Sequence, residues 1–250
     1  MKVIGVIPAR YHSTRLPAKL LADILGKPMV QHVYELAQKA KLLDETIVAT
    51  DDERIVAAVR DFGGRVVLTN PAHASGTDRA AEVASSSDAD IVVNVQGDEP
   101  LLDPEMIDEC VLVLQNALLE KDGVEFSTVI KRVGEETFDD RGVVKVVRDL
   151  KGRALYFSRS LIPFPRHRIE AFQVFEHIGL YAYTRKCLMR LSQLPPTPLE
   201  QVEGLEQLRA LENGIAIQTV ETKCQGELIS VDTLEDLNRV RAVLAKRRKQ

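Results

Sequence analysis

The first half of the chain alternates between short apolar runs and stretches with helical spacing of apolar residues. Runs rich in β-branched residues predict strands at 3–7, 46–50, 66–69 and 91–95. Between them, the spacing of apolar residues predicts a helix over 29–42, and the acidic residues that open 51–62 suit a helix N-terminus. Strands that alternate with helices in this way form a parallel sheet with crossover helices.

The pattern changes after about residue 123. Further strands are predicted at 126–132, 143–148, 177–183 and 215–220. A helix is predicted over 199–213, where Gly214 supplies a stop, and a closing helix over 233–246. We therefore expect an α/β protein with a Rossmann-like, mostly parallel sheet and a mixed-sheet second half, built as one continuous unit rather than as two independent domains.

Composition narrows the classes of partner. The net charge of −4 gives no sign of a nucleic-acid footprint or of adhesion to an anionic membrane, so an anionic ligand must be bound locally. The three cysteines are far apart, which argues against a disulfide framework and against a structural zinc site. The chain begins with a strand-like run, and no apolar run approaches the roughly 18 residues of a membrane span. The cytoplasm is the expected compartment.

A basic loop, Pro8–Lys19, follows the first predicted strand. Arg10, Arg15 and Lys19 supply three cations, and Ser13 and Thr14 add hydroxyl groups. The carboxyl end of such a strand is where open α/β sheets bind ligands, so this loop is a candidate phosphate site. It lacks the glycine spacing of a P-loop and of a dinucleotide-binding fold. A solvated basic loop is the alternative.

A second candidate follows the buried strand at 91–95, which delivers Asp98 to the same edge of the sheet. A carboxylate at this place suits Mg²⁺, which takes one or two carboxylates and completes its shell with phosphate oxygens and water. The alternative is an ordinary turn, because Gly-Asp and Glu-Pro are turn signals.

Two segments that precede predicted helices complete the set. The run Ser75–Arg79 opens a helix whose free N–H groups suit a base carbonyl or a phosphate, although Ser75 or Thr77 also reads simply as an N-cap. Asp232 precedes the closing helix, where it is either an N-cap or a second metal carboxylate, and Thr233 with Asp236 fits a variant of the capping box.

Taken together, these segments resemble the sugar-activating nucleotidyltransferases, and most closely the 3-deoxy-manno-octulosonate cytidylyltransferase (CMP-Kdo synthetase) family. The resemblance spans nearly the whole chain. It is carried by Lys19 and by the motifs IPAR (7–10), STRLP (13–17), GKPM (26–29), ATD (49–51), SGTDR (75–79), NVQGDEP (94–100), ALYFSR (154–159), HIGLY (177–181), LEQLR (205–209) and VDT (231–233). The sequence departs from the pattern at Ala18, where many relatives have glycine, and over 226–230.

The resemblance implies a role for each matching residue. The triphosphate would be held by Arg10, Ser13, Arg15 and Lys19. The cytidine would be surrounded by Pro8, Ala9, Ser75, Gly76, Arg79 and Gln96. Mg²⁺ would be bound by Asp98 and Asp232, and Arg10, Lys19 and Asp98 would be the catalytic groups. The acid sugar would be bound by Arg159, His177, Tyr181, Glu206 and Gln207.

The resemblance also implies the reaction, transfer of CMP from CTP to 3-deoxy-D-manno-octulosonate (Kdo) with release of pyrophosphate, in lipopolysaccharide biosynthesis. It implies a homodimer, with a nucleotide-binding part at about 1–122, a sugar-binding and dimerisation part at about 123–213 and a metal-bearing segment at about 214–250. The alternatives are a cytidylyltransferase for 8-amino-Kdo or another acid sugar and, in a different class, a non-catalytic nucleotide-binding regulator. An NAD-dependent enzyme is disfavoured because the glycine fingerprint is missing.

Overall fold

The computed structural model describes residues 1–13, 15–167 and 172–248. The chain divides into two compact units, the first formed by Met1–Asp108 with Cys224–Gln250 and the second by Glu109–Lys223. The second unit is therefore an insertion into the first, and helix α4 (Pro104–Leu119) carries the chain from one to the other. The boundaries at 108 and 223 differ from the expected ones at about 122 and 213, and the roles expected of those parts stay predictions.

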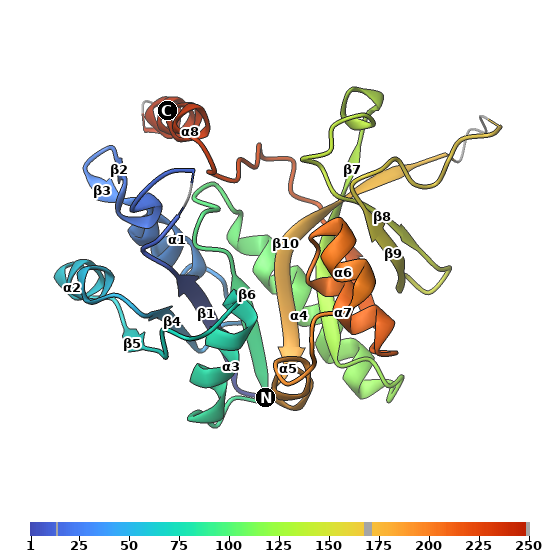
Figure 1. Ribbon diagram of the computed structural model, residues 1–250, viewed down its shortest axis with the longest axis horizontal. Coiled ribbons are helices and arrows are strands. Elements are labelled where there is room, and N and C mark those ends of the chain that lie inside the picture. The colour runs from blue at the N-terminus through green and yellow to red at the C-terminus, as the bar shows by residue number, and fades with distance from the viewer. Residues whose placement is uncertain (14, 168–171, 249–250) are drawn as a thin grey trace. The chain divides into compact units, whose positions relative to one another are not determined.

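The first unit contains a parallel sheet in the order β6, β1, β4, β5 (Figure 1). Its strands are β1 (Val3–Ala9), β4 (Glu45–Thr50), β5 (Val66–Leu68) and β6 (Ile91–Val95). Side chains on both faces of β1 and β6 are buried, as their nearly continuous apolar sequence predicts. The predicted parallel half of the fold is confirmed.

Helices α1 (Met29–Ala37), α2 (Glu53–Asp61) and α3 (Gly76–Ser85) pack against this sheet. Helix α8 (Leu234–Arg247) contacts β2 (Asp23–Ile24), which pairs with β3 (Lys27–Pro28) as a separate two-stranded sheet, and the short helix η1 (Lys19–Leu21) precedes β2. Helix α1 ends earlier than the expected residue 42. The N–H groups of Lys41 and Leu42 donate instead to the Asp108 carboxylate, at 3.1 and 2.8 Å, which holds that segment outside the helix.

The second unit contains the mixed sheet that the sequence predicts. Its elements are β7 (Phe126–Val133), η2 (Glu135–Thr137), β8 (Lys145–Arg148), β9 (Ala154–Ser158), β10 (Val174–Thr184), α5 (Arg185–Leu191), α6 (Pro198–Glu203), α7 (Gln207–Glu212) and β11 (Ile217–Glu221). Strand β7 pairs in parallel with β11 and antiparallel with β10, whereas β8 pairs antiparallel with both β10 and β9. Strand β9 and helices α4 and α5 were not among the predicted elements.

The expectation of a single helix over 199–213 is wrong. The chain forms α6 and α7 instead, because Gly204 lies between them in the left-handed conformation, with φ of 64°, which ends a helix (Figure 1). The N–H of Thr197, the N-cap of α6, donates to the Glu200 carboxylate at 3.0 Å where this helix starts. The break places Glu206 and Gln207 at the beginning of α7 rather than in the middle of a longer helix.

Ala18, where the family resemblance leads us to expect glycine, has an unusual backbone. Its φ of 52° and ψ of 30° lie in the left-handed region, where a side chain costs roughly 1 kcal/mol relative to glycine. This residue precedes η1, the turn that carries Lys19. The conformation explains why glycine suits the position, and it shows that the turn is kept even with alanine.

Two expectations about cysteines and membranes can be compared with the structure. Cys110, Cys187 and Cys224 are all buried, and none of the three is joined in a disulfide bond. Within the described ranges, no helix combines the length and the apolar character that crossing a membrane requires.

Candidate active site

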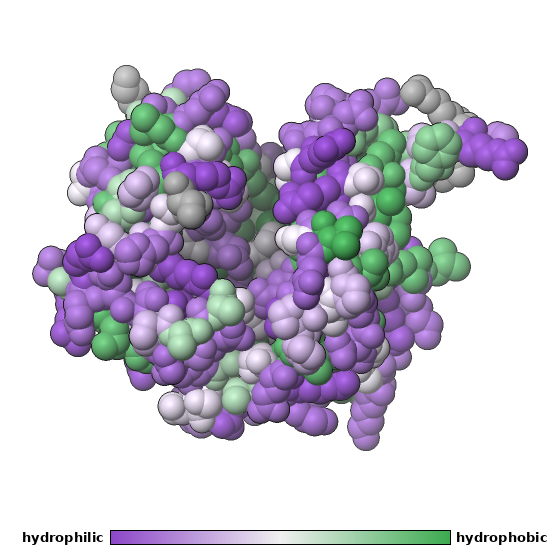
Figure 2. All heavy atoms as spheres, viewed as in Figure 1, coloured by the Kyte–Doolittle hydropathy of each residue, from purple (hydrophilic) through white to green (hydrophobic). Residues whose placement is uncertain are grey.

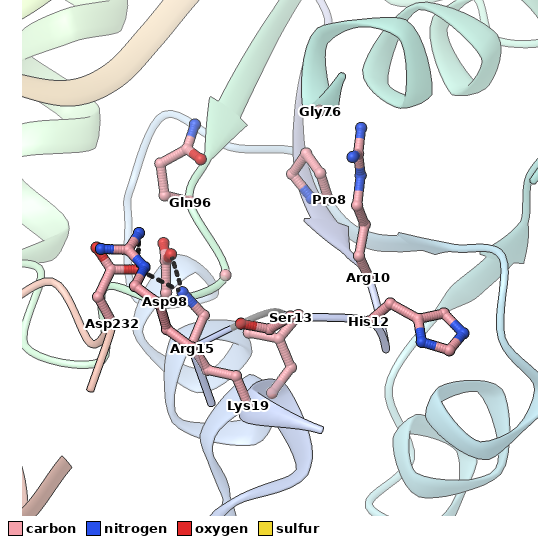
Figure 3. Close-up of a pocket in the computed structure, with 12 residues that line it drawn as sticks. Pro8, Arg10, His12, Ser13, Arg15, Lys19, Gly76, Gln96, Asp98 and Asp232 are labelled. Carbon is pink, nitrogen blue, oxygen red and sulfur yellow. Dashed lines mark hydrogen bonds and ion pairs between the residues drawn. The ribbon is translucent and has the colours of Figure 1, made fainter. Parts of the chain in front are cut away.

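A cavity of about 420 Å³ opens where β1 and β6 end (Figure 3). These strands are parallel neighbours, with Val6 opposite Asn94, so the loops that follow them meet at one edge of the sheet. The cavity is lined by the basic loop, the start of α3, the segment after β6 and the segment before α8, through Pro8, Arg10, His12, Ser13, Arg15, Lys19, Leu20, Gly76, Gln96, Gly97, Asp98 and Asp232. Thr14 lies outside the described residues. The expected position of the loop at the strand end is confirmed.

Lys19 joins the two carboxylates at this cavity. Its Nζ donates to Oδ2 of Asp98 at 2.6 Å and to Oδ1 of Asp232 at 3.1 Å (Figure 3). Nη2 of Arg15 lies 2.9 Å from the same oxygen of Asp232. Lys19 and Asp232 are 213 positions apart in the sequence, so this contact exists only in the folded chain. The basic loop is thus held by specific ion pairs rather than solvated along its length.

These ion pairs change the electrostatics of Lys19. Its side chain is only 12% exposed, and burial alone would lower the pKa of its ammonium group. The charge and hydrogen bond of Asp98, followed by those of Asp232, outweigh burial and raise the pKa of Lys19 above its ordinary value. The ammonium group therefore stays charged at neutral pH and can bind an anion at this edge.

Asp232 reaches the site because the segment before α8 is fixed at both ends. The N–H of Val231 donates to the carbonyl of Asp98 at 2.9 Å, which sets the two segments side by side. The N-cap of α8 is Thr233, whose hydroxyl forms a capping box with Asp236. The carboxylate of Asp232 is therefore free of capping, and its partners are Lys19 and Arg15.

Close approach of three backbone segments shapes the wall of the cavity. A Cβ at Gly97 would lie 3.0 Å from the carbonyl oxygen of Pro8, and one at Gly76 would lie 3.3 Å from the Pro8 ring. Contacts this short require the neighbour to move. The two glycines thus allow the start of α3 and the loop after β6 to close around the end of β1, next to Gln96.

Three of the residues expected to bind the nucleotide do not line this cavity. Ala9 is a buried residue of β1. Ser75 is the N-cap of α3, where its hydroxyl accepts from the N–H of Asp78 and its own N–H donates to the Asp78 carboxylate. Arg79 is 1% exposed and lies inside the unit. For Ser75 the capping interpretation is the one that the structure displays.

Arg79 ties two loops to helix α3 rather than lining the cavity. Its Nη2 donates to Oδ2 of Asp51 at 2.6 Å, and its Nη1 donates to Oγ1 of Thr69 at 2.8 Å. These partners follow β4 and β5, so the guanidinium group fixes the loops at the carboxyl edge of the sheet relative to α3. The side chain therefore stabilises the loops next to the cavity without lining the cavity itself.

Replacing Arg79 by methionine should therefore act on stability first. We expect a loss of about 3 kcal/mol in the free energy of unfolding, because a buried ion pair loses one partner. Urea denaturation measures this loss, and Asp51→Asn is the matched variant from the other side of the pair. A raised KM for the expected nucleotide in an Arg79→Met protein of unchanged stability would instead indicate direct contact with that nucleotide.

Sequence reasoning missed two aromatic residues of the basic loop. The guanidinium carbon of Arg54 lies 3.3 Å from the centre of the Tyr11 ring, and Arg54 is itself held by both oxygens of Asp52. His12 lines the cavity. The acidic start of α2 and the basic loop were both noticed in the sequence, but only the folded chain brings Arg54 onto Tyr11.

In the second unit, three of the residues expected to bind the sugar form one buried cluster. Nδ1 of His177 lies 3.5 Å from Nε2 of Gln207, and the hydroxyl of Tyr181 donates to Oε1 of Gln207 at 3.4 Å. Burial, followed by the charge of Glu206, raises the pKa of Tyr181 above its ordinary value, so the phenol stays protonated. His177 and Tyr181 come from β10, and Glu206 and Gln207 from the beginning of α7.

Arg159 lies in a separate cavity of about 380 Å³ in the same unit, lined by Phe138, Asp139, Arg141, Arg159, Ser160 and Leu161. Its position is fixed by Glu203, a residue that the sequence did not single out. Nε of Arg159 donates to the carbonyl of Glu203 at 2.9 Å, and its N–H donates to the Glu203 carboxylate at 3.0 Å. Ser158 donates to the same carboxylate at 2.6 Å.

The carboxylates of Asp98 and Asp232 fit a hard divalent cation. They already share one cation, the Lys19 ammonium group, and two carboxylates that leave room for water and phosphate oxygens are the donor set that Mg²⁺ prefers. Elsewhere in the described part of the chain, the group of three potential ligands is Asp103, Glu105 and Cys224. A buried thiol beside two carboxylates does not match magnesium chemistry.

Comparisons with known proteins agree with this geometry. The cytidylyltransferase family model matches residues 4–220. The 3-deoxy-manno-octulosonate cytidylyltransferase of Geobacter sulfurreducens is 52% identical over 96% of this chain and 98% of its own length. The enzyme of the same name from Geotalea daltonii is 53% identical over 96% and 97%.

Solved structures give the same result at the level of the fold. A structure of CMP:2-keto-3-deoxy-manno-octonic acid synthetase complexed with CTP superposes with a TM-score of 0.90 at 44% identity, covering 99% of this chain and 100% of that one. A 4-diphosphocytidyl-2C-methyl-D-erythritol synthase from Anaerococcus prevotii, 15% identical, superposes with a TM-score of 0.63 over 98% of both chains and shows the shared fold alone. The chain belongs to the 3-deoxy-manno-octulosonate cytidylyltransferase family of nucleotidyltransferases.

Proposed function

We propose that this protein transfers CMP from CTP to Kdo, giving CMP-Kdo and pyrophosphate for lipopolysaccharide biosynthesis. The observation that carries the proposal is the junction of Lys19 with Asp98 and Asp232 in a cavity that also holds Arg10 and Arg15. Family membership and the CTP-bound relative support the choice of nucleotide and of sugar.

The reaction forms a bond between the anomeric oxygen of Kdo and the α-phosphorus of CTP and breaks the bond from that phosphorus to the β-phosphate oxygen. Pyrophosphate leaves, and the proton of the anomeric hydroxyl passes to solvent. In phosphoryl chemistry of this kind, positioning and neutralisation of charge account for most of the rate. A basic loop on a rigid strand end supplies both.

The nucleotide is held by the first unit in this proposal. Arg10, Arg15 and Lys19 neutralise the triphosphate, and the Ser13 hydroxyl adds a donor. Pro8, Gly76 and Gln96 surround the cytidine, where Gly76 allows close approach of the base to the start of α3. Ser75 and Arg79 contribute indirectly, because they fix the positions of α3 and the neighbouring loops.

Mg²⁺ is the cofactor in this proposal, held by Asp98 and Asp232. When bound, it supplies positive charge that neutralises phosphate oxygens and orients the reacting groups. Lys19 donates to both carboxylates in the structure, so a metal ion held by Asp98 and Asp232 would compete with its ammonium group for them. Arg15, on the outer side of Asp232, remains available to the triphosphate because its side chain is 64% exposed.

The second unit binds the acid sugar in this proposal. Arg159 offers a guanidinium group to the carboxylate of Kdo, since it lines a cavity and its orientation is held by Glu203. His177, Tyr181, Glu206 and Gln207 provide polar groups for the sugar hydroxyls. The three that form hydrogen bonds to one another are preorganised, which lowers the entropy cost of binding.

Assembly as a homodimer and a cytoplasmic location are further parts of the proposal. A dimer is supported by large apolar side chains that are exposed on the second unit, at Leu155 of β9, Phe164, and Leu199 and Val202 of α6. Strand β9 and α6 are adjacent, because Ser158 bonds to Glu203. On the face seen in Figure 2, green patches interrupt the mostly purple surface of this unit. Sedimentation of the purified protein tests the dimer.

Pyrophosphate release tests the proposed reaction. Purified protein with CTP, Kdo and Mg²⁺ should release pyrophosphate and form CMP-Kdo, and omission of either substrate should abolish the signal. Tight binding of CTP without turnover of any acid sugar would instead favour a non-catalytic nucleotide-binding protein.

A further inference from the structure

The His177 cluster contains a buried hydroxyl, that of Thr128 in β7, which has no role in the reaction as described above. Thr128 is fully buried. Its Oγ1 lies 2.8 Å from the carbonyl oxygen of Leu180, 3.3 Å from that of Ile178 and 3.1 Å from Nε2 of His177. The pairing of β10 with β7 shifts register between Ile178 and Tyr181, so both carbonyls lie within reach of the hydroxyl.

Counting hydrogens fixes the direction of these contacts. A threonine hydroxyl has one hydrogen to donate, and a carbonyl oxygen can only accept. The short contact to Leu180 therefore takes the hydrogen of Thr128, and the contact to His177 is made by a hydrogen on Nε2 that points at Oγ1. If the ring carried its hydrogen on Nδ1 instead, Nε2 would accept the hydrogen of the Thr128 hydroxyl. The buried carbonyl of Leu180 would then lose its hydrogen bond, which is costly.

The tautomer of His177 then determines which atoms donate and which accept in its contact with Gln207 and in the contact of Gln207 with Tyr181. With the hydrogen on Nε2, Nδ1 can only accept, so the Gln207 amide turns its NH₂ group toward the ring at 3.5 Å. The Gln207 carbonyl oxygen is then the acceptor for Tyr181 at 3.4 Å. One directed chain of hydrogen bonds runs from Tyr181 to Leu180.

We propose that Thr128 is a positioning residue, whose hydroxyl holds His177 in the neutral Nε2–H form and thereby fixes which atoms of Gln207 and Tyr181 donate and accept toward the acid sugar. The inference rests on the proposed function, in which these residues bind Kdo. A reversed network would exchange donors for acceptors, and a site built for particular hydroxyl groups discriminates strongly against such a mismatch.

The surroundings of His177 keep the ring neutral. Burial lowers its pKa to about 3. The ring packs against Phe157 of β9, with centroids 5.0 Å apart, and against Tyr181 of its own strand, with centroids 5.4 Å apart. The ring also contacts Thr128 of β7 and Gln207 of α7, and these four neighbours are all uncharged at neutral pH. Because burial already keeps the His177 ring neutral, a neighbouring residue can determine its tautomer but not its charge.

The tautomer itself can be measured without turnover. In protein labelled with ¹⁵N-histidine, long-range nitrogen–proton spectra distinguish Nε2–H from Nδ1–H, and His177→Asn identifies the signals of this ring. We expect a neutral Nε2–H ring at neutral pH. A predominant Nδ1–H or imidazolium form in the unmodified protein overturns the inference, whatever the variants do.

Two variants of Thr128 test its role. Thr128→Val keeps the shape and removes the hydroxyl, so we expect some Nδ1–H ring and a rise of about tenfold in KM for Kdo with an unchanged KM for CTP, the effect of one lost hydrogen bond. Thr128→Ser keeps the hydroxyl and should retain the tautomer and the KM for Kdo. If the valine variant does not fold, the unmodified protein and the serine variant still decide the question.

The contrary outcomes are distinct. An unchanged tautomer in Thr128→Val, or a changed tautomer with an unchanged KM for Kdo, overturns the positioning role. Absence of pyrophosphate release from the unmodified protein with Kdo contradicts the proposed function. The NMR measurement would still show whether Thr128 determines the tautomer of His177.

Discussion

Asp98→Asn should lower the turnover number by about 10³-fold, the size of effect that follows loss of one charged contact to the transition state. The substitution keeps the shape of the side chain and removes its negative charge. Asp98 is 27% exposed at the wall of the cavity, and its carboxylate is the nearer of the two partners of Lys19. The expected loss therefore combines a weaker site for Mg²⁺ with a Lys19 ammonium group that is drawn toward Asp232 alone.

Steady-state pyrophosphate release measures the turnover number of this variant, and binding of Mn²⁺ followed by electron paramagnetic resonance measures the metal site separately. Asp88→Asn is the matched control, because Asp88 is 79% exposed and pairs with Lys2. Turnover and Mn²⁺ binding equal to those of the unmodified protein would remove Asp98 from the active site.

Lys19→Met should lower kcat/KM for CTP by a similar factor, about 10³-fold, because the triphosphate loses a buried cation. The raised pKa of Lys19 means that its charge is present throughout the neutral range. Binding of Mn²⁺ without nucleotide should not weaken in this variant, since the carboxylates of Asp98 and Asp232 no longer share the ammonium group. Loss of activity without loss of metal binding separates Lys19 from the two aspartates.

The control for this variant is Lys39→Met, which removes an exposed lysine outside the cavity. Isothermal titration with CTP in the absence of metal shows whether the loss lies in binding or in turnover. A Lys19→Met protein that binds CTP normally and turns over at the unmodified rate would contradict the role proposed for this loop.

The parallel half of the fold followed from local patterns. The apolar runs that became β1, β4 and β6 are buried on both faces, so their hydrophobic sequence reports directly on their environment, whereas β5, at the end of the strand order, is only half-buried and exposes Leu68. Local signals were weaker in the second unit. The helix predicted over 199–213 is broken because a single left-handed glycine, Gly204, ends α6, and an isolated glycine in a helical pattern does not reveal its backbone conformation.

The candidate site was predictable to the extent that strand ends define it. Lys19 and Asp98 follow parallel strands of one sheet, so their arrival at the same edge could be anticipated, whereas the pairing of β6 with β1 that brings them into contact is seen only in the structure. The role of Asp232 was ambiguous in the sequence, because either Asp232 or Thr233 could be the N-cap of the helix that follows. The hydrogen bond from Val231 to Asp98 and the cap at Thr233 resolve that ambiguity, and both depend on the folded chain.

Arg79 and His177 illustrate what sequence could not supply. Resemblance identified both, but the type of each residue does not reveal whether it touches a ligand or supports a neighbour. Arg79 is buried against Asp51 and Thr69, which are distant in the sequence and are brought together by the sheet. His177 depends on Thr128 from another strand, and the bulge that makes this contact possible leaves no recognisable pattern in the sequence.

Transfer of CMP to Kdo at this site is tested most directly by pyrophosphate release measured across a matrix of nucleoside triphosphates and acid sugars. We expect CTP with Kdo, in the presence of Mg²⁺, to give the highest kcat/KM, and removal of the metal with a chelator to abolish the reaction until Mg²⁺ is restored. Preference for 8-amino-Kdo or another acid sugar would contradict the choice of substrate. Absence of pyrophosphate with every pair would contradict the proposed activity.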